Sequence, residues 1–332
     1  MGDKNLVPSG LAYLADNIIS KQNILGAAKE TKARWAKDLK LPQTGETLFF
    51  AGCGYQYAGE LDLLSSMARK ADKSILGADR LVSLAGFQKK LGINPVSMIS
   101  KTKGGDSAEP LKDAVKVLGK LGVKFGYLGS DEPCCGGLLY YTGLHHDFAK
   151  NAQITYSRLK SFGVKRLISV VPSCTYTLRN LFPPFIGGYD LEVKHFVEVI
   201  LANLPSLKLR FPGETRVTYH DSCQMVRFLG MVEEPRQILR AIKGIDFVET
   251  EWTKGEWATC CGGGGGFEAV FPELSHILAV NRVKELLETG ADIIVTHCPG
   301  CIMQLKSGLK ELKVSGVKVL DLAQIVAMSL EA

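Results

Sequence analysis

Short apolar runs alternate with longer amphipathic stretches along most of the chain. Short apolar runs bounded by turn residues are typical of buried strands, and apolar residues at every third or fourth position are typical of helices. The pattern predicts strands at 47–51, 123–128, 167–171 and 193–196 in the first half, and at 216–220, 247–249, 293–296 and 317–320 in the second. This alternation predicts an α/β fold in which helices flank mainly parallel sheets.

The order of the cysteine-containing segments is repeated in the two halves of the chain. In the first half, the pair Cys134-Cys135 precedes a predicted helix and a strand that leads to Cys174. In the second half, the pair Cys260-Cys261 precedes a helix and a strand that leads to Cys298 and Cys301. Chance similarity between two α/β segments is the alternative, but cysteine offsets that match over this length argue against it. The sequence therefore indicates an internal duplication.

The length of the chain and the repeat together predict two domains. A chain of 332 residues exceeds the usual size of one domain. We expect two pseudo-symmetric domains after an N-terminal helical arm, with the arm at 1–46, the first domain at 47–210 and the second at 211–332. An insert at about 64–113, rich in Lys and Gly, separates Cys53 from Cys134 by 80 residues. We interpret the insert as a surface excursion, with a docking surface for a partner subunit as the alternative.

The second half contains five of the nine cysteines, and their spacing is regular. Cys223 and Cys260 are separated by 36 residues, and Cys261 and Cys298 are also separated by 36. We expect a cytoplasmic protein, in which thiols stay reduced, so cysteines in this number indicate metal binding before disulfides. Each cysteine group follows a predicted strand, and ligand sites in α/β sheets lie at the carboxyl ends of strands. The cysteines of each half are therefore expected to converge in one crevice.

The chemistry of the second cysteine set favours an iron–sulfur cluster over a structural zinc ion. Zinc is satisfied by four tetrahedral ligands, whereas this set offers five thiols. The neighbours Cys260 and Cys261 have difficulty reaching one tetrahedral ion, but they can reach different irons of a larger cluster. The glycine run that follows includes Gly262, Gly263 and Gly264, which we expect to approach the cluster and aim backbone N–H groups at its sulfides. The alternative is that this glycine run is a flexible loop without a role in cluster binding.

Three segments of the second half resemble a known family. They are similar to the CCG cysteine-rich domain of the B and D subunits of heterodisulfide reductase, and they read Tyr219-His220-Asp221-Ser222-Cys223, Cys260-Cys261-Gly262-Gly263-Gly264-Gly265 and Cys298-Pro299-Gly300-Cys301. The repeated arrangement extends over nearly the whole chain from residue 47. Segment 23–36 more weakly resembles the linker after the ferredoxin domain of D-type subunits. The resemblance implies a non-cubane [4Fe–4S] cluster, the catalytic centre, held by Cys223, Cys260, Cys261, Cys298 and Cys301.

The first cysteine set has one thiol fewer than the second. Its members are Cys53, Cys134, Cys135 and Cys174. The position equivalent to Cys298 is occupied by Val171, so one ligand of a five-thiol site is missing. A cubane [4Fe–4S] cluster takes four cysteines and is the leading expectation here.

The sequence leaves three alternatives to a cubane cluster at the first set. Zinc is one alternative, and a modified non-cubane cluster is another, with Ser173, Tyr55 or a backbone group in place of the missing thiol. The third alternative is a relic of the duplication that binds no metal. His145 and His146 follow the motif on a predicted helix and are candidate ligands. Surface or helix-cap positions are the more common roles of such histidines.

The sequence lacks the common motifs that bind other redox cofactors. It has no GxGxxG after a strand, no P-loop and no ferredoxin-type CxxCxxCxxxCP run. Electrons are therefore expected from a partner, namely a ferredoxin-like iron–sulfur subunit fed by a flavoprotein or a membrane quinol module. The resemblance implies an oxidoreductase subunit that passes these electrons to a thiol or disulfide substrate or to another redox acceptor.

Two other functions compete with this interpretation. One, which the resemblance also implies, is an electron relay or docking subunit without a substrate site, in glycolate, lactate, glycerol-phosphate, sulfur or benzoyl-CoA metabolism. The other is a zinc-bound structural adaptor. The ligand missing from the first set argues against a mechanism that treats both halves of a disulfide symmetrically. Gln224, Arg227 and His297 flank the second set and are candidates to orient a substrate or tune the cluster, with structural hydrogen bonding as the alternative.

Charge and hydropathy narrow the range of partners. The net charge is +6 and the basic residues are spread along the chain, so we do not expect a nucleic-acid partner. No apolar run approaches the roughly 18 residues of a membrane span, and the N-terminal residues lack the features of a secretory signal. We expect a cytoplasmic protein, associated with a membrane only through a partner subunit.

Overall fold

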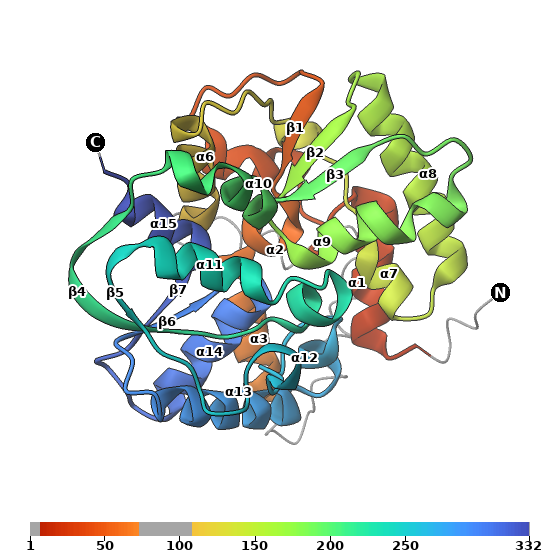
Figure 1. Cartoon of the computed structure of the whole chain (residues 1–332). Coiled ribbons are helices and arrows are strands. Elements are labelled where there is room, and N and C mark those ends of the chain that lie inside the picture. The colour runs from red at the N-terminus through yellow and green to blue at the C-terminus, as the bar shows by residue number, and fades with distance from the viewer. Residues whose placement is uncertain (1–6, 73–107, 332) are drawn as a thin grey trace.

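The computed structural model describes residues 7–72 and 108–331, and its framework is two parallel sheets (Figure 1). The first sheet has the order β1 (Thr47–Phe50), β2 (Arg166–Ser169) and β3 (Glu192–His195). The second has the order β5 (Lys243–Phe247), β4 (Arg210–Tyr219), β6 (Ile293–Thr296) and β7 (Lys318–Asp321). Every pair of neighbouring strands is parallel, which confirms the predicted α/β class.

Helices connect the strands and cover the sheets. Those of the first half are α1 (Ser9–Lys21), α2 (Gly52–Gln56), α3 (Ala58–Asp72), α6 (Glu109–Lys120), α7 (Gly137–Tyr141), α8 (His145–Ser161), α9 (Pro172–Tyr176) and α10 (Phe196–Asn203). Those of the second half are α11 (Glu233–Ala241), α12 (Phe267–Val270), α13 (Pro272–Leu287), α14 (Pro299–Glu311) and α15 (Leu322–Ser329). Parallel strands require such crossovers, because each chain segment must return to the same edge of the sheet.

The strand register relates the two halves. β1, β2 and β3 correspond to β4, β6 and β7, and both series are followed by a short helix that begins with a capping box. β5 lacks a full counterpart: the strand predicted at 123–128 is wrong except for a single parallel bridge between Leu48 and Gly126. The pairing does not continue because the chain turns after Tyr127: Leu128 caps a short 3₁₀ helix, Gly129–Asp131, and its carbonyl accepts from the N–H of Asp131. The strand predicted at 247–249 is also misplaced, since β5 ends at Phe247.

The expected helical arm and insert are both partly integrated into the core. Helix α1 and a 3₁₀ helix, Lys29–Ala36, bury Ile18 and Trp35, and the Trp35 indole N–H donates to the Tyr127 hydroxyl at 2.9 Å. The expectation for 73–107 lies outside the described residues. Where the insert continues into α6, the surface excursion is wrong, because α6 packs its apolar face, with Leu111 fully buried, against α15.

The two halves share one hydrophobic core. The final helix of each half packs on the other half, since α10 contacts α11 and α15 contacts α6. The larger buried cluster accordingly contains residues from both sheets. A smaller cluster lies between α13, α14 and the second sheet, and it comprises Val283, Leu286, Ile294, Leu305, Leu309 and Val319. The domain boundaries at 46/47 and 210/211 stay predictions. Within the described residues, no helix combines the length and apolar character required to cross a bilayer.

Candidate metal centres

The four cysteines of the first set converge below the carboxyl end of the first sheet. Cys53 lies in α2 directly after β1, Cys174 lies in α9 directly after β2, and the pair Cys134-Cys135 precedes α7. The sulfur atoms of Cys53 and Cys134 are 3.8 Å apart, and those of Cys135 and Cys174 are 3.2 Å apart. All four side chains are buried and none forms a disulfide. The set is therefore an enclosed four-thiol site.

The environment of this enclosed site keeps its thiols protonated. Hydrogen bonding to Cys135 and burial raise the pKa of Cys134 to about 12. Hydrogen bonding to Cys134 and burial raise the pKa of Cys53 well above its ordinary value. A metal centre that binds these groups as thiolates must displace their protons.

Val171 fills the place of the missing thiol. The backbone of Gly52 has a φ of +70°, and a Cβ atom there would lie 2.9 Å from Cγ2 of Val171 and 3.1 Å from the sulfur of Cys174. The N–H group of Gly52 is held by the buried carboxylate of Glu132 at 3.0 Å. The turn after β1 is thus packed directly against the valine, so the first site is closed where the second carries Cys298.

Of the other candidate ligands of the first site, Tyr55 and the two histidines have other surroundings, whereas Ser173 lies next to a cysteine of the set. The Tyr55 hydroxyl donates to Asp321 in the second half, so it does not replace the missing thiol. His145 and His146 are exposed in the first turn of α8, and the His145 ring stacks edge-on against Tyr140 at 4.8 Å. Ser173 lies in α9 beside Cys174, where its carbonyl accepts from Thr177.

The second set also lies at the carboxyl ends of its strands, but it is more open. Cys223 follows β4, Cys298 is the N-cap of α14, and Cys301 lies in the first turn of that helix. The sulfur atoms of Cys261 and Cys301 are 3.2 Å apart, well beyond a disulfide bond length. Cys260 is exposed, and Cys223 and Cys298 are half-buried. This site therefore offers five thiols, of which three are accessible from solvent.

The glycine run lies close against the second site. Gly262 has a φ of +81°, and a Cβ atom there would lie 2.1 Å from the Ser275 carbonyl, so the position requires glycine. Its N–H donates to the sulfur of Cys260 at 3.3 Å. Gly264 differs from the expectation, because its N–H donates to the Glu268 carboxylate at 2.8 Å. Five convergent thiols beside a close backbone approach fit an iron–sulfur cluster better than a four-ligand zinc ion.

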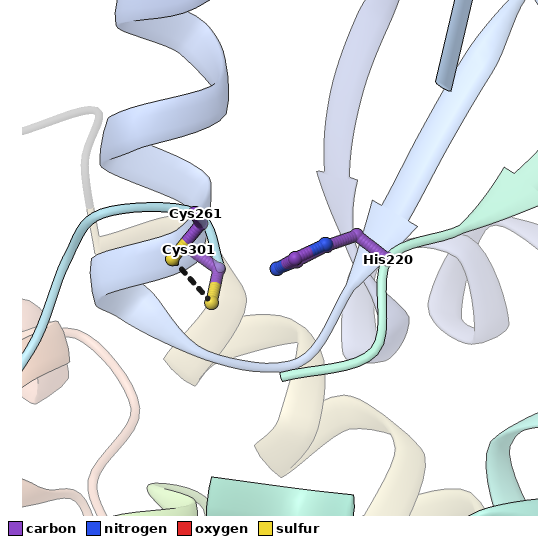
Figure 2. Close-up of side chains that lie close together, drawn as sticks. All are labelled: His220, Cys261 and Cys301. Atoms are coloured by element: carbon purple, nitrogen blue, oxygen red, sulfur yellow. Dashed lines mark hydrogen bonds between the residues drawn. The ribbon is translucent and has the colours of Figure 1, made fainter. Parts of the chain in front are cut away.

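A histidine that the sequence interpretation did not assign to the site also lies in it. His220 is buried at the end of β4, and Figure 2 shows its ring pointing toward Cys261 and Cys301. A ring nitrogen of His220 and the two sulfur atoms lie within 4.8 Å of one another. Hydrogen bonds from Cys260 and Cys301, and then from His220, hold the pKa of Cys261 well below its ordinary value. The sequence feature that could have pointed to His220 is its position three residues before Cys223.

The three flanking candidates make ordinary structural hydrogen bonds. The Gln224 side-chain carbonyl accepts from the Tyr141 hydroxyl at 3.2 Å, and the Arg227 guanidinium donates to the Ala258 carbonyl at 3.0 Å. The His297 ring is buried and its Nδ1 atom lies 2.8 Å from the Asp321 carboxylate. These contacts hold the loops around the second site in place.

Comparison with known proteins identifies the repeated unit. The model of the CCG family, described as a cysteine-rich domain, matches residues 99–179 and again residues 217–306. The chain belongs to the CCG cysteine-rich domain family. The second matched CCG segment contains all five cysteines, whereas the first leaves out Cys53, which lies beyond the long separation before Cys134.

Curated relatives are larger redox proteins. The D subunit of the dihydromethanophenazine:CoB–CoM heterodisulfide reductase of Methanosarcina barkeri is 36% identical over 65% of this chain and 54% of its own length. The B subunit of the fumarate reductase (CoM/CoB) of Methanothermobacter marburgensis is 28% identical over 88% of this chain and 58% of its own. An iron–sulfur protein of Methanocaldococcus jannaschii is 30% identical over 65% and 42%. The chain thus spans about half the length of these relatives.

Proposed function

We propose that this chain is an iron–sulfur subunit of a heterodisulfide-reductase-like oxidoreductase complex, with the reactive centre at the second cysteine set. The difference between the two sites carries the proposal. The second site has five thiols and an open side at Cys260, whereas the first has four buried thiols and Val171 in the fifth position. An iron with an exchangeable position would bind a thiolate substrate. Only the second site offers the access that such a substrate needs.

The proposed occupants follow from the same difference. A non-cubane [4Fe–4S] cluster at the second site uses Cys223, Cys260, Cys261, Cys298 and Cys301. The four enclosed thiols suit a cubane [4Fe–4S] cluster, which takes four cysteine ligands. Electrons then arrive from a ferredoxin-like or flavin-containing partner and leave to a thiol, a disulfide or another redox acceptor. The names of the relatives support this class of reaction.

The decisive experiment combines metal analysis with one substitution. Anaerobically purified protein is expected to contain at least four irons per chain with matching sulfide and no stoichiometric zinc. Cys261→Ala is expected to abolish the paramagnetic signal of the second cluster and to leave that of the first, because Cys261 lies only in the second set. Survival of both signals would refute the ligand assignment, and stoichiometric zinc would establish the structural adaptor instead.

Access by a substrate is tested separately. The spectrum of the oxidised second cluster is expected to change when a thiol is added, as measured by electron paramagnetic resonance. A spectrum that stays the same with every thiol and disulfide tried would favour an electron relay without a substrate site.

A further inference from the structure

The proton of His220 is fixed by a buried arginine. Arg282 extends from α13 and is fully buried, and its Nε atom lies 3.0 Å from Nδ1 of His220. The guanidinium is itself held by the Glu285 carboxylate at 2.6 Å and the Thr253 hydroxyl at 3.1 Å. A guanidinium only donates hydrogen bonds, so Nδ1 must be the acceptor and carries no proton. The ring proton of the neutral imidazole therefore lies on Nε2.

The protonated nitrogen is the one that faces the thiols. In Figure 2 the far end of the His220 ring, which carries Nε2, points at the sulfur atoms of Cys261 and Cys301. A nitrogen that carries a proton has no lone pair for a metal ion. His220 is thus excluded as an iron ligand by the contact with Arg282, although its distance from the thiols would allow ligation.

We propose that His220 donates an Nε2–H hydrogen bond to the thiolates of Cys261 and Cys301, and that Arg282 is the positioning residue that enforces this tautomer. The inference rests on the proposed function, in which a cluster is bound by these thiolates. An N–H donor to a ligating sulfur stabilises the more negative, reduced state of a cluster and so raises its reduction potential. The pair thereby sets the potential of the second cluster.

The first half provides an internal comparison. Phe50, at the end of β1, pairs with Ser169 of β2. His220 has the equivalent place after β4, where its N–H donates to the carbonyl of Val295 and its carbonyl accepts from the Thr296 hydroxyl. Phe50 lies three residues before Cys53, as His220 lies three residues before Cys223. Phe50 is buried and has no side-chain N–H group. The first site therefore lacks this donor as well as the fifth thiol.

The energetic cost of Arg282 supports a functional role. Among the described residues, its Nη2 atom is buried without a hydrogen-bond partner. A buried ion pair is seldom retained for stability, because desolvation opposes the charge attraction. A buried guanidinium with one unsatisfied nitrogen is instead consistent with a residue kept for its effect on His220.

The first test measures the reduction potential of each cluster in the intact protein. His220→Phe, which installs the residue of the first site, is expected to shift the reduction equilibrium of the second cluster at least tenfold toward oxidation, or about 59 mV for one electron. The potential of the first cluster should not change. His220→Gln, which restores an N–H donor, should recover most of the shift. An unchanged second potential in a loaded His220→Phe protein would overturn the inference.

Two variants guard against misfolding and nonspecific effects. His220→Phe leaves the Nε atom of Arg282 without its acceptor. The double variant His220→Phe/Arg282→Met is therefore measured as well and should show the same lowered potential. His276→Phe is the matched control, since His276 lies on the same helix as Arg282 but contacts Glu311 at 3.3 Å. It should leave both potentials unchanged.

The second test does not depend on a cluster. In protein with ¹⁵N-labelled histidine, nuclear magnetic resonance is expected to show the His220 proton on Nε2, and Arg282→Met should release this preference. A proton on Nδ1 in the wild-type protein would overturn the inference. If wild-type protein held no iron at the second site, the proposed function would fail, while the tautomer would still decide whether Arg282 orients His220.

Discussion

Asp221 shows how strongly a single buried carboxylate organises the second site. Its two oxygens each accept a hydrogen bond of 2.8 Å from the Arg236 guanidinium, and both side chains are buried. One oxygen also accepts from the backbone N–H of Gly255 at 2.8 Å. Asp221 lies two residues before Cys223, and Gly255 begins the short 3₁₀ helix that leads toward Cys260. The same pair therefore anchors two of the segments that carry the cysteines.

Removal of this carboxylate should destabilise the protein strongly. Asp221→Ala removes the fully buried partner of Arg236 and leaves Glu249 at 2.8 Å and the exposed Glu233 at 3.9 Å. Breaking such a buried pair costs about 3–5 kcal/mol in the free energy of unfolding. Anaerobic urea denaturation measures the loss. Glu46→Ala, which breaks an exposed pair with Lys165, serves as the control and should change the free energy of unfolding far less. A loss of similar size in both variants would contradict the role of burial.

The packing of α6 against α15 joins the two halves of the chain and partly buries a carboxyl group on α6. α6 is amphipathic, and its apolar face meets the final helix of the second half. Asp113 lies on the same helix, where burial and the nearby Glu109 raise its pKa to about 6. The folded state therefore binds a proton more tightly at Asp113 than the unfolded chain does. This contribution to stability is present below the ordinary pKa of an aspartate and is lost as the pH rises through 6.

Asp113→Asn should for this reason stabilise the protein at high pH. At pH 8 the variant avoids a partly buried charge, and after allowance for solvent screening the gain is about 1 kcal/mol. The gain should shrink as the pH is lowered to 5, where thermal unfolding of both proteins is compared. Asp38→Asn, at an exposed position in the N-terminal segment, should show no such pH-dependent gain. An equal effect of Asp113→Asn at pH 5 and pH 8 would argue against a raised pKa at this carboxyl.

At the level of the complete chain, residues of the first cysteine motif reach into the second half. The Tyr55 hydroxyl donates to Asp321, the residue that caps α15 and contacts His297. A Cβ atom on the adjacent Gly54 would lie 2.6 Å from Pro299, at the start of α14. The two cysteine sets are therefore held at a fixed position relative to each other, by contacts as well as by the shared core.

Tyr55→Phe should reveal this connection between the halves. The change removes one buried hydrogen bond to a charged group, worth about 1.5–3 kcal/mol. Because Asp321 caps α15, amide hydrogen exchange at the start of α15 should accelerate although the substitution lies in the first half. Tyr57→Phe is the matched control, since its hydroxyl contacts Thr31 at 2.9 Å within the first half. Faster exchange at α15 in both variants would show a general loosening instead.

Local patterns determined much of the architecture before any tertiary contact was known. Strand β6 and helices α8 and α13 follow from apolar periodicity, and the cysteine offsets revealed the duplication because spacing along the chain survives divergence of the residues between. The segment 123–128 shows the limit of this reasoning. It is apolar enough for a strand, but only Gly126 pairs with β1, and Leu128 already begins a short 3₁₀ turn. The first turn of α6 was likewise included in the surface insert at about 64–113, because its partner α15 lies some 200 residues away in the sequence.

The sequence by itself determined that two cysteine sets exist and that they differ by one thiol at Val171. It also placed Cys53, Cys174, Cys223 and Cys298 shortly after parallel strands. The tertiary structure alone decided that the first set is enclosed and the second open, and that the Tyr55 hydroxyl contacts Asp321 in the second half. It also brought Arg282, 62 residues away in the sequence, into contact with His220. The spacing of the cysteines is a property of the covalent chain. Burial, and the hydrogen bonds that residues such as Arg282 make around a site, depend on which distant segments meet when the core forms.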